Sequence, residues 1–205
     1  MIVSLFVSAA FAAPAGMIDV KSVAPTVVVA MKYATADNFL GYAFYTGPEA
    51  GICWLTPATA EKVRQAEEIV AAEGYHLILY DCARPPAYQY PMWDTCVATH
   101  GTGHCSGLVA NPYERLSGHT YGKVIDVGLV ASDGSVIEIP SKYDSGLFPG
   151  DTSTDKARAR PPASGSTTKP ATWTDAGWKH YLILARALIA SGFSGITSEW
   201  WHWKG

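Results

Sequence analysis

The chain of 205 residues carries a formal net charge of −3, with 48% hydrophobic and 16% charged residues. Such a balance is typical of a globular protein with a substantial core, and it excludes an intrinsically disordered chain. The basic residues form no concentrated patch in the sequence, so we expect no binding to nucleic acid.

Residues 1–15 are uncharged and mostly apolar, and they end in small residues. The run is shorter than the ~20 residues that a helix needs to cross a bilayer, so we expect no stable membrane span. It is typical of a secretory signal peptide that ends at an Ala-Phe-Ala or Ala-Pro-Ala site, although the usual basic residues before the apolar run are absent. A buried N-terminal strand is the alternative. We expect export to a secreted or periplasmic location, and a single domain over residues 16–205.

The four cysteines fit an exported protein, in which disulfides are favoured over free thiols. Four cysteines allow three pairings, and the sequence alone does not choose among them. Cys96 and Cys105 flank a glycine-rich stretch and are the natural local pair, in which case Cys53 and Cys82 would join two core segments. A cysteine-ligated zinc site is disfavoured because no Cys-x-x-Cys pair occurs.

The first half of the chain contains one clear helix between two predicted strands. A β-branched apolar run predicts a strand over residues 26–31. Residues 57–74 predict a helix, with Thr56 as its cap, a proline in the first turn and Gly74 at its end. Residues 75–80 predict a buried strand that ends at Asp81-Cys-Ala-Arg-Pro-Pro86, where the two prolines force the chain out of the sheet. Arg84 is therefore presented at a strand end, and residues 98–111 are expected to form a loop.

The second half alternates between loops and short elements. A loop containing Ser117 and His119 turns at Gly122 and enters an apolar strand that carries Asp126, and a turn at Gly134 predicts a hairpin partner over residues 136–139. Residues 141–172 are rich in Gly, Pro, Ser and Thr, and we expect a long flexible loop over the site, near 145–172. A second helix is predicted over 175–191, before a short final strand. The order of these elements predicts an α+β fold with a small, mostly antiparallel sheet packed against a few helices.

Side chains suited to one metal ion are split between two distant stretches. His119 and Asp126 lie in Ser117-Gly-His-Thr-Tyr-Gly-Lys-Val-Ile-Asp126, and His202 lies in Ser198-Glu-Trp-Trp-His-Trp203. Two histidines and a carboxylate would leave the fourth position open, as catalytic zinc requires. Each residue alone is weak evidence for a metal site, since a lone histidine is more often structural and an aspartate that enters a strand is often a turn or capping residue.

Two further residues have the chemistry for hydrolysis of an amide. Glu199 would take the proton of a zinc-bound water and pass it to the leaving amine. Arg84 would stabilise the developing oxyanion, because its guanidinium stays charged. A salt bridge to Asp81 is an equally favoured role for Arg84. Glu199 and His202 would face opposite ways on one extended strand, so a twist, bulge or turn is needed to bring both to the metal.

The pattern Ser117-x-His119-x-x-Gly122-x-x-Ile125-Asp126, followed by Glu199-Trp-Trp-His202, resembles the VanX-type zinc D-alanyl-D-alanine dipeptidases of peptidase family M15. The family shares its fold with D,D-carboxypeptidases and hedgehog signalling domains. The resemblance extends to Tyr33-Ala-Thr-Ala-Asp-Asn-Phe39 and Tyr80-Asp-Cys-Ala-Arg-Pro85, so it covers most of the chain in order.

The resemblance implies one zinc ion per chain, a small dipeptide substrate and a role in peptidoglycan metabolism. It implies His119, Asp126 and His202 as zinc ligands, Glu199 as the catalytic base and Arg84 as the stabiliser of the transition state. It places five residues at the dipeptide pocket: Ser117, Asp81, Tyr33, Trp200 and, as a counter-ion for the substrate ammonium with a poorer local match, Asp144. It says nothing about the oligomeric state.

The chain also departs from the family. Lys123 and Val124 precede the Ile-Asp pair where many relatives have a small residue, and Gly128 stands where a hydroxyl residue is common. The 145–172 loop has little family character. Two alternatives therefore stay open: a D,D-carboxypeptidase or cell-wall endopeptidase that acts on longer peptidoglycan peptides, and a zinc-binding module without catalysis, as in hedgehog-like domains. A metal site at His100 and His104 lacks a third ligand and is disfavoured.

Overall fold

The computed structural model describes residues 13–135, 137–163, 166 and 168–205. Most of the predicted signal peptide therefore lies outside the described residues. The strands are β1 (Ile18–Asp19), β2 (Val28–Val29), β3 (Trp54–Leu55), β4 (Tyr75–Asp81), β5 (Val124–Ala131), β6 (Ser194–Gly195) and β7 (His202–Lys204). The α-helices are α1 (Pro57–Ala71), α2 (Pro86–His100), α3 (Thr102–Cys105), α4 (Ser153–Arg158) and α5 (Asp175–Ala190). Short 3-10 helices are η1 (Val20–Ser22), η2 (Lys32–Ala34) and η3 (Gly118–Tyr121).

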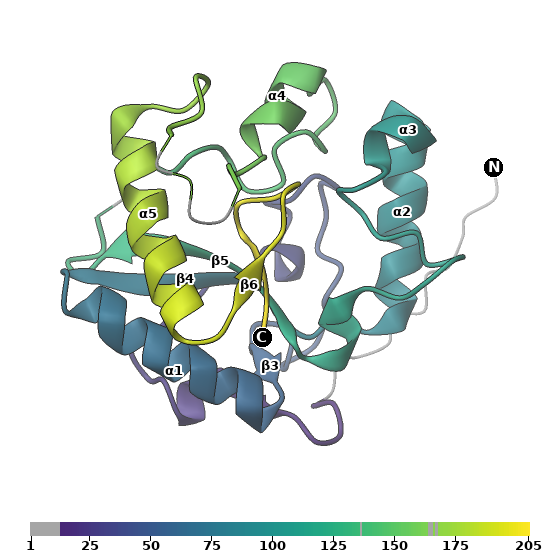
Figure 1. Ribbon diagram of the computed structural model, residues 1–205. Helices are drawn as coiled ribbons and strands as arrows, with labels where there is room; N and C mark the ends of the chain where they lie inside the picture. Colours follow the sequence, from purple (N-terminus) through teal and green to yellow (C-terminus); the bar gives the residue numbers. More distant parts are fainter. Residues whose placement is uncertain (1–12, 136, 164–165, 167) are drawn as a thin grey trace.

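A five-stranded sheet in the order β2-β4-β5-β7-β6 forms the centre of the protein, and β1 and β3 form a separate two-stranded pair. Only the β2–β4 pair of the larger sheet is parallel. The α+β fold with a mostly antiparallel sheet is thus confirmed. Helices α1 and α5 lie together along the sheet, and α2 and α3 lie on the opposite side of the molecule (Figure 1).

The two long helices near the sheet begin where the sequence predicts. The Thr56 hydroxyl caps α1 by accepting a hydrogen bond from the backbone N–H of Thr59, and Gly74 follows the helix with a φ of +86° that favours glycine. Not every apolar residue of α5 lies on its inner face. Leu182 and Ile189 are 41% and 47% exposed, whereas Ile183 and Leu184 are buried.

Three other predictions of secondary structure are wrong. The strand predicted over 26–31 is reduced to β2, and residues 137–139 form no hairpin strand, while residue 136 lies outside the described residues. The loop predicted over 98–111 contains the end of α2 and the whole of α3. Pro86 suits the first turn of α2, but Pro91 lies inside the helix. Because a proline inside a helix is unfavourable, the sequence pattern does not predict α2.

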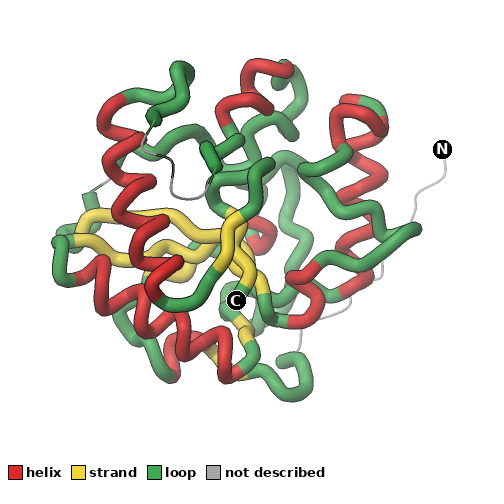
Figure 2. The backbone as a smooth tube through the Cα atoms, in the orientation of Figure 1, coloured by secondary structure: helices red, strands yellow, loops and turns green. Residues whose placement is uncertain are grey.

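Part of the segment predicted as a long loop packs onto α2 and α3. It contains α4, and within it Tyr143, Asp144 and Leu147 are buried. His100 donates from Nε2 to the Leu147 carbonyl at 2.8 Å, and His104 Nε2 contacts the Gly146 carbonyl. These contacts fix the backbone that carries Asp144. The tube view shows that long loops, drawn in green, connect the helices and strands around the sheet (Figure 2).

Both disulfides have the pairing expected from the local Cys96–Cys105 bond. Cys53 is bonded to Cys82, at a sequence separation of 29, and Cys96 is bonded to Cys105, at a separation of 9. Two disulfides indicate an oxidising environment outside the cytoplasm. None of the described helices has the length and apolar character needed to cross a membrane.

The Cys53–Cys82 bond is expected to contribute more stability than the Cys96–Cys105 bond. By loop-closure entropy, replacing both Cys53 and Cys82 by alanine should lower the free energy of unfolding by roughly 3–4 kcal/mol, against roughly 2–3 kcal/mol for the shorter loop. Urea unfolding of the two double variants measures the difference. Equal losses, or a larger loss at Cys96 and Cys105, would contradict this ranking.

Candidate metal centre

Three adjacent strands bring carboxylates and a histidine into one row across the sheet. Asp126 on β5 is the cross-strand partner of Asp81 on β4 and of His202 on β7. Residues directly opposite each other in a sheet point to the same face. The neighbours of Asp126 along β5, Ile125 and Val127, are fully buried on the other face. The sheet thus aims polar side chains to one side and builds its core on the other.

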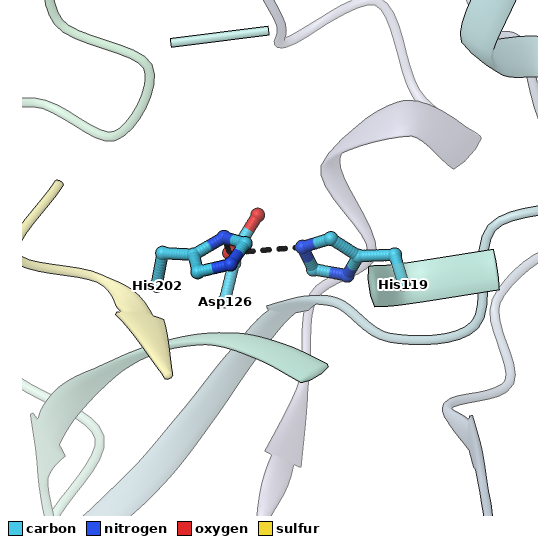
Figure 3. Close-up of side chains that lie close together, drawn as sticks. All are labelled: His119, Asp126 and His202. Carbon is cyan, nitrogen blue, oxygen red and sulfur yellow. Dashed lines mark ion pairs between the residues drawn. The ribbon is translucent and has the colours of Figure 1, made fainter. Parts of the chain in front are cut away.

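His119 reaches the same point from η3, the short helix before β5. Ser117 caps η3 through its side-chain oxygen, and Gly122 ends it in a left-handed conformation with a φ of +61°. A Cβ at Gly122 would lie 2.8 Å from the sulfur of Met17, whose flexible side chain would have to move, and 3.2 Å from the backbone nitrogen of Thr56; the positive φ is the stronger reason for glycine there. Figure 3 shows His119, Asp126 and His202 converging from η3, β5 and β7.

The donor atoms of these three residues are placed for one cation. They all lie within 4.8 Å of one another. Asp126 Oδ1 is 3.2 Å from His119 Nε2 and 3.1 Å from His202 Nδ1. Both Asp126 Oδ1 and His119 Nε2 are buried without a hydrogen-bond partner. Buried polar atoms are almost always satisfied, so two orphaned atoms that face each other fit a site for a metal ion.

The remaining atoms of the ligands are held by neighbours. His119 Nδ1 lies 2.8 Å from the carbonyl oxygen of Cys82, so Nδ1 donates and the lone pair of Nε2 faces the site. Tyr143 donates its hydroxyl hydrogen to Asp126 Oδ2 at 2.8 Å, which leaves Oδ1 free. The Cys53–Cys82 disulfide therefore holds the peptide that orients His119.

Charge at the site suits a cation as well. Burial acts to raise the pKa of Asp126, but the two histidines outweigh it and hold this pKa well below its usual range. Burial lowers the pKa of His202, whereas at His119 the same effect is outweighed by Asp126 and Asp81, which raise the pKa of that ring. Both rings must be neutral to bind a metal, so protons compete with the metal as pH falls.

Tyr143 is a residue that sequence reasoning missed, and its hydroxyl can be tested apart from its ring. Tyr143→Phe keeps the ring contacts with Tyr80 and Trp201 but frees Asp126 Oδ2. We expect the dissociation constant for zinc to rise about 10–100-fold, because the hydrogen bond from Tyr143 holds the Asp126 carboxylate in the geometry that a metal ligand needs. Competition with a chromophoric chelator measures it. Tyr113→Phe, which removes a hydroxyl at the surface, is the control and should leave zinc affinity unchanged; an equal effect of both substitutions would contradict the assigned role.

A cavity of about 700 Å³ opens onto the three metal-ligand candidates. Five of the other residues predicted from the sequence line it: Ser117, Tyr33, Arg84, Asp144 and Glu199. Asp81 and Trp200 do not. Asp81 is fully buried and accepts hydrogen bonds from Arg84. Trp200 is also buried, and its Nε1 donates to Ser141 Oγ at 3.0 Å. The neighbouring Trp201 is the tryptophan that lines the cavity.

Glu199 reaches the cavity because it precedes the final strand. Residues 197–201 form a bend, and β7 begins only at His202. The opposing directions that an extended strand would impose on Glu199 and His202 therefore do not arise, and Glu199 Oε2 lies 3.4 Å from His202 Nδ1. Burial raises the pKa of Glu199 well above its usual value, and the charges of Asp126 and Asp144 add to this shift.

Arg84 is both a salt-bridge partner and a wall of the cavity. Its Nε and Nη2 donate to Asp81 Oδ2 at 3.0 and 2.5 Å, and its Nη1 donates to Gln89 Oε1 at 2.9 Å. Of the five guanidinium N–H donors, these bonds use three. Burial opposes the charge, but Asp81 outweighs it and raises the pKa, so Arg84 stays a cation. Gln89 lies one turn into α2, and recognising the Pro85-Pro86 start of that helix would have placed it near Arg84.

Asp144 is a buried carboxylate on the wall of the cavity. It is 3% exposed and adopts a φ of +59°. Tyr33 donates its hydroxyl hydrogen to Asp144 Oδ2 at 2.9 Å, and the Tyr33 ring centroid lies 5.3 Å from Arg84 Cζ. Burial raises the pKa of Asp144 well above its usual value, with Asp126 adding to the shift. A positive group brought next to Asp144 would stabilise its charged form.

The unusual Gly128 is explained by its neighbour on β4. A Cβ at Gly128 would lie 2.6 Å from the hydroxyl oxygen of Tyr80, so the tyrosine fills the space that a side chain would take. The Tyr80 ring packs against Tyr143, with 4.9 Å between ring centroids. Gly128 thereby makes room for the ring that supports the Asp126 partner.

Comparison with known proteins shows the family of the chain. A family model described as D-ala-D-ala dipeptidase matches residues 13–205. The D-alanyl-D-alanine dipeptidase of Escherichia coli (strain K12) is 24% identical over 188 residues, which is 92% of this chain and 83% of that protein. The Enterococcus faecium enzyme of the same name is 27% identical over 183 residues, or 84% of this chain and 82% of that protein. A solved LdcB LD-carboxypeptidase is 14% identical, with a TM-score of 0.42, over 94% of this chain and 69% of that one.

Proposed function

The chain belongs to the D-Ala-D-Ala dipeptidase family of M15 peptidases, and from that premise we propose that it is a zinc-dependent dipeptidase that hydrolyses D-Ala-D-Ala or closely related dipeptides. The observation that carries the proposal is the pair of orphaned, buried donor atoms on His119 and Asp126, in one cavity with Glu199 and Arg84. We further propose an exported enzyme, on the basis of the two disulfides.

His119 Nε2, Asp126 Oδ1 and His202 Nδ1 would hold the zinc ion. When bound, zinc supplies a Lewis acid that polarises the peptide carbonyl and lowers the pKa of water. The protein's own part is to fix the ligands through Cys82 and Tyr143 before substrate arrives. Pre-organised ligands and a fixed charge cost no reorganisation during the reaction.

Glu199 would move the proton. Its carboxylate takes a proton from the attacking water and delivers it to the nitrogen of the leaving amine, which then departs as the C–N bond breaks. A carboxyl whose pKa is raised by burial holds a proton more readily near neutral pH than an exposed one does, which suits both halves of this transfer. Arg84 would donate to the carbonyl oxygen as negative charge develops there.

Asp144 favours a free N-terminus on the substrate. A buried carboxylate that accepts a hydrogen bond from Tyr33 gains an ion pair from a substrate ammonium. A longer peptide would present an uncharged amide there, and Asp144 would then lose that ion pair. This feature favours a dipeptidase over a D,D-carboxypeptidase. Glu199 and Arg84 together weigh against a zinc module without catalysis, since a structural zinc closes its fourth position. Ser117 would contact the other end of the dipeptide.

An assay of zinc-loaded protein separates these functions. We expect turnover of D-Ala-D-Ala and much slower turnover of L-Ala-L-Ala and of a pentapeptide that ends in D-Ala-D-Ala. Release of D-Ala from the pentapeptide only would show a carboxypeptidase. Zinc binding without turnover of any of the three peptides would favour the non-catalytic module.

A further inference from the structure

The cavity holds more space than the proposed substrate needs. Its volume of about 700 Å³ falls within the range of pockets that enclose drug-sized ligands, and a dipeptide with two methyl side chains is far smaller. Part of the wall is apolar and fully formed. This part, which we call the apolar lobe, consists of the buried side chains of Phe39, Met92, Trp93, Val109 and Leu147.

Two members of the apolar lobe adjoin Asp144. The backbone N–H of Leu147 donates to the Asp144 carbonyl at 3.0 Å, so both residues belong to one turn. The Phe39 ring packs edge-on against the ring of Tyr33, with 6.3 Å between centroids, and the Tyr33 hydroxyl bonds Asp144. Apolar surface therefore lies next to the carboxylate that would receive the substrate ammonium.

The other three members adjoin the support of Arg84. Met92 and Trp93 follow Gln89 by about one turn of α2 and so share its side of the helix. Gln89 accepts from Arg84 Nη1 and donates from Nε2 to the Ala110 carbonyl at 2.8 Å, directly beside Val109. The apolar lobe is thus bounded by Asp144 at one end and by the Gln89–Arg84 contact at the other.

This arrangement determines which substrate side chain meets the apolar lobe, given the proposed function. With the ammonium at Asp144 and the peptide carbonyl between Arg84 and the metal ligands, the α-carbon of the N-terminal residue lies between them. We propose that the apolar lobe binds the side chain of that residue and that the enzyme prefers dipeptides with a bulky apolar N-terminal residue, such as D-Leu-D-Ala, over D-Ala-D-Ala. His100 and His104 contact the carbonyls of Leu147 and Gly146 and so anchor the backbone that carries Leu147, a member of the lobe.

The test compares kcat/KM for D-Leu-D-Ala and D-Ala-D-Ala with the zinc-loaded full chain. Because each methylene accommodated in an apolar pocket is worth about tenfold or more, we expect D-Leu-D-Ala to be preferred by at least about tenfold. A ratio above one supports the apolar lobe, and a ratio at or below one overturns it. Turnover of neither peptide would overturn the proposed function itself, so the two failures are distinguishable.

Two substitutions that fill the apolar lobe test whether the lobe is the source of the preference for D-Leu-D-Ala. Val109→Phe and Leu147→Phe should each lower the ratio of the two kcat/KM values about tenfold. Val97→Phe is the matched control, because Val97 lies on α2 outside the cavity, and it should leave the ratio unchanged. The same fall in the control as in both lobe variants would overturn the assignment.

A binding measurement gives a second readout that needs no turnover. Calorimetric titration of zinc-loaded Glu199→Gln with each dipeptide should give a dissociation constant for D-Leu-D-Ala at least about tenfold below that for D-Ala-D-Ala. Equal or weaker binding of D-Leu-D-Ala would overturn the proposal even if its turnover were faster.

Discussion

Replacing Glu199 by glutamine is expected to lower kcat for D-Ala-D-Ala by about 10³–10⁴-fold, the upper range for the loss of a general acid–base group. Glutamine keeps the size of the side chain but accepts no proton at the point where the water and the leaving amine need one. Zinc content should stay at one per chain, because Glu199 is not among the three ligand candidates. Steady-state kinetics with metal analysis of the same sample measure both quantities.

Glu114 offers a matched control for that substitution. Its carboxylate lies on the wall of the same cavity but is exposed and accepts a hydrogen bond from Asn111. Glu114→Gln removes the same charge without touching the proposed proton transfer and should change kcat less than about threefold, in line with a surface charge. If Glu114→Gln and Glu199→Gln lowered kcat equally, the loss would reflect the charge of the cavity and not a general base.

Replacing Arg84 by lysine is expected to lower kcat by about 10²–10³-fold, as the loss of one oxyanion donor does, with a smaller change in KM. Lysine keeps the charge opposite Asp81 but lacks the planar set of donors that can bond Asp81, Gln89 and a substrate oxygen together. Alanine is the poorer choice, because an unpaired buried Asp81 would cost about 3–5 kcal/mol of stability.

Separate measurement of folding and catalysis decides between the two roles of Arg84. Thermal unfolding of Arg84→Lys should show a stable protein, while kinetics show the loss in kcat. Gln89→Ala removes the Nη1 contact of Arg84 together with the Gln89 bond to the Ala110 carbonyl, and serves as the intermediate variant, with a loss smaller than that of Arg84→Lys. If Arg84→Lys kept the wild-type kcat, Arg84 would have only a structural role, as the salt-bridge partner of Asp81.

The sequence predicts the parts of the fold that depend on local patterns. Helix α1 has a cap at Thr56 and a stop at Gly74, and β4 and β5 are mostly apolar. The sequence pattern does not predict helix α2, because prolines occur at its start and inside it. Packing of Met92, Trp93 and Cys96 stabilises the helical structure there. The strand predicted over 26–31 is shortened because only Val28 and Val29 pair with β4.

Sequence motifs predict which residues form the candidate site, but they do not predict its geometry. The spacing of Glu199 and His202 predicts opposing side chains only if both lie on a strand, and the bend at 197–201 depends on tertiary contacts such as Trp200 N–H to the Ala159 carbonyl at 2.8 Å. Tyr143 has its role through Asp126, on a different element of the fold. Gln89 lies close to Arg84 in the sequence, but its role depends on helix α2, which the sequence pattern does not reveal. Asp144, whose local match is poor, reaches the cavity because the loop that carries it is anchored to α2 and α3.

The direct test of the metal centre is the location of zinc by anomalous X-ray scattering at its absorption edge, in crystals of the zinc-loaded protein. The geometry predicts one peak per chain, coordinated by His119 Nε2, Asp126 Oδ1 and His202 Nδ1, with Glu199 beside the open position. A peak at the stacked pair His100 and His104, or none among the three ligands, would contradict the account.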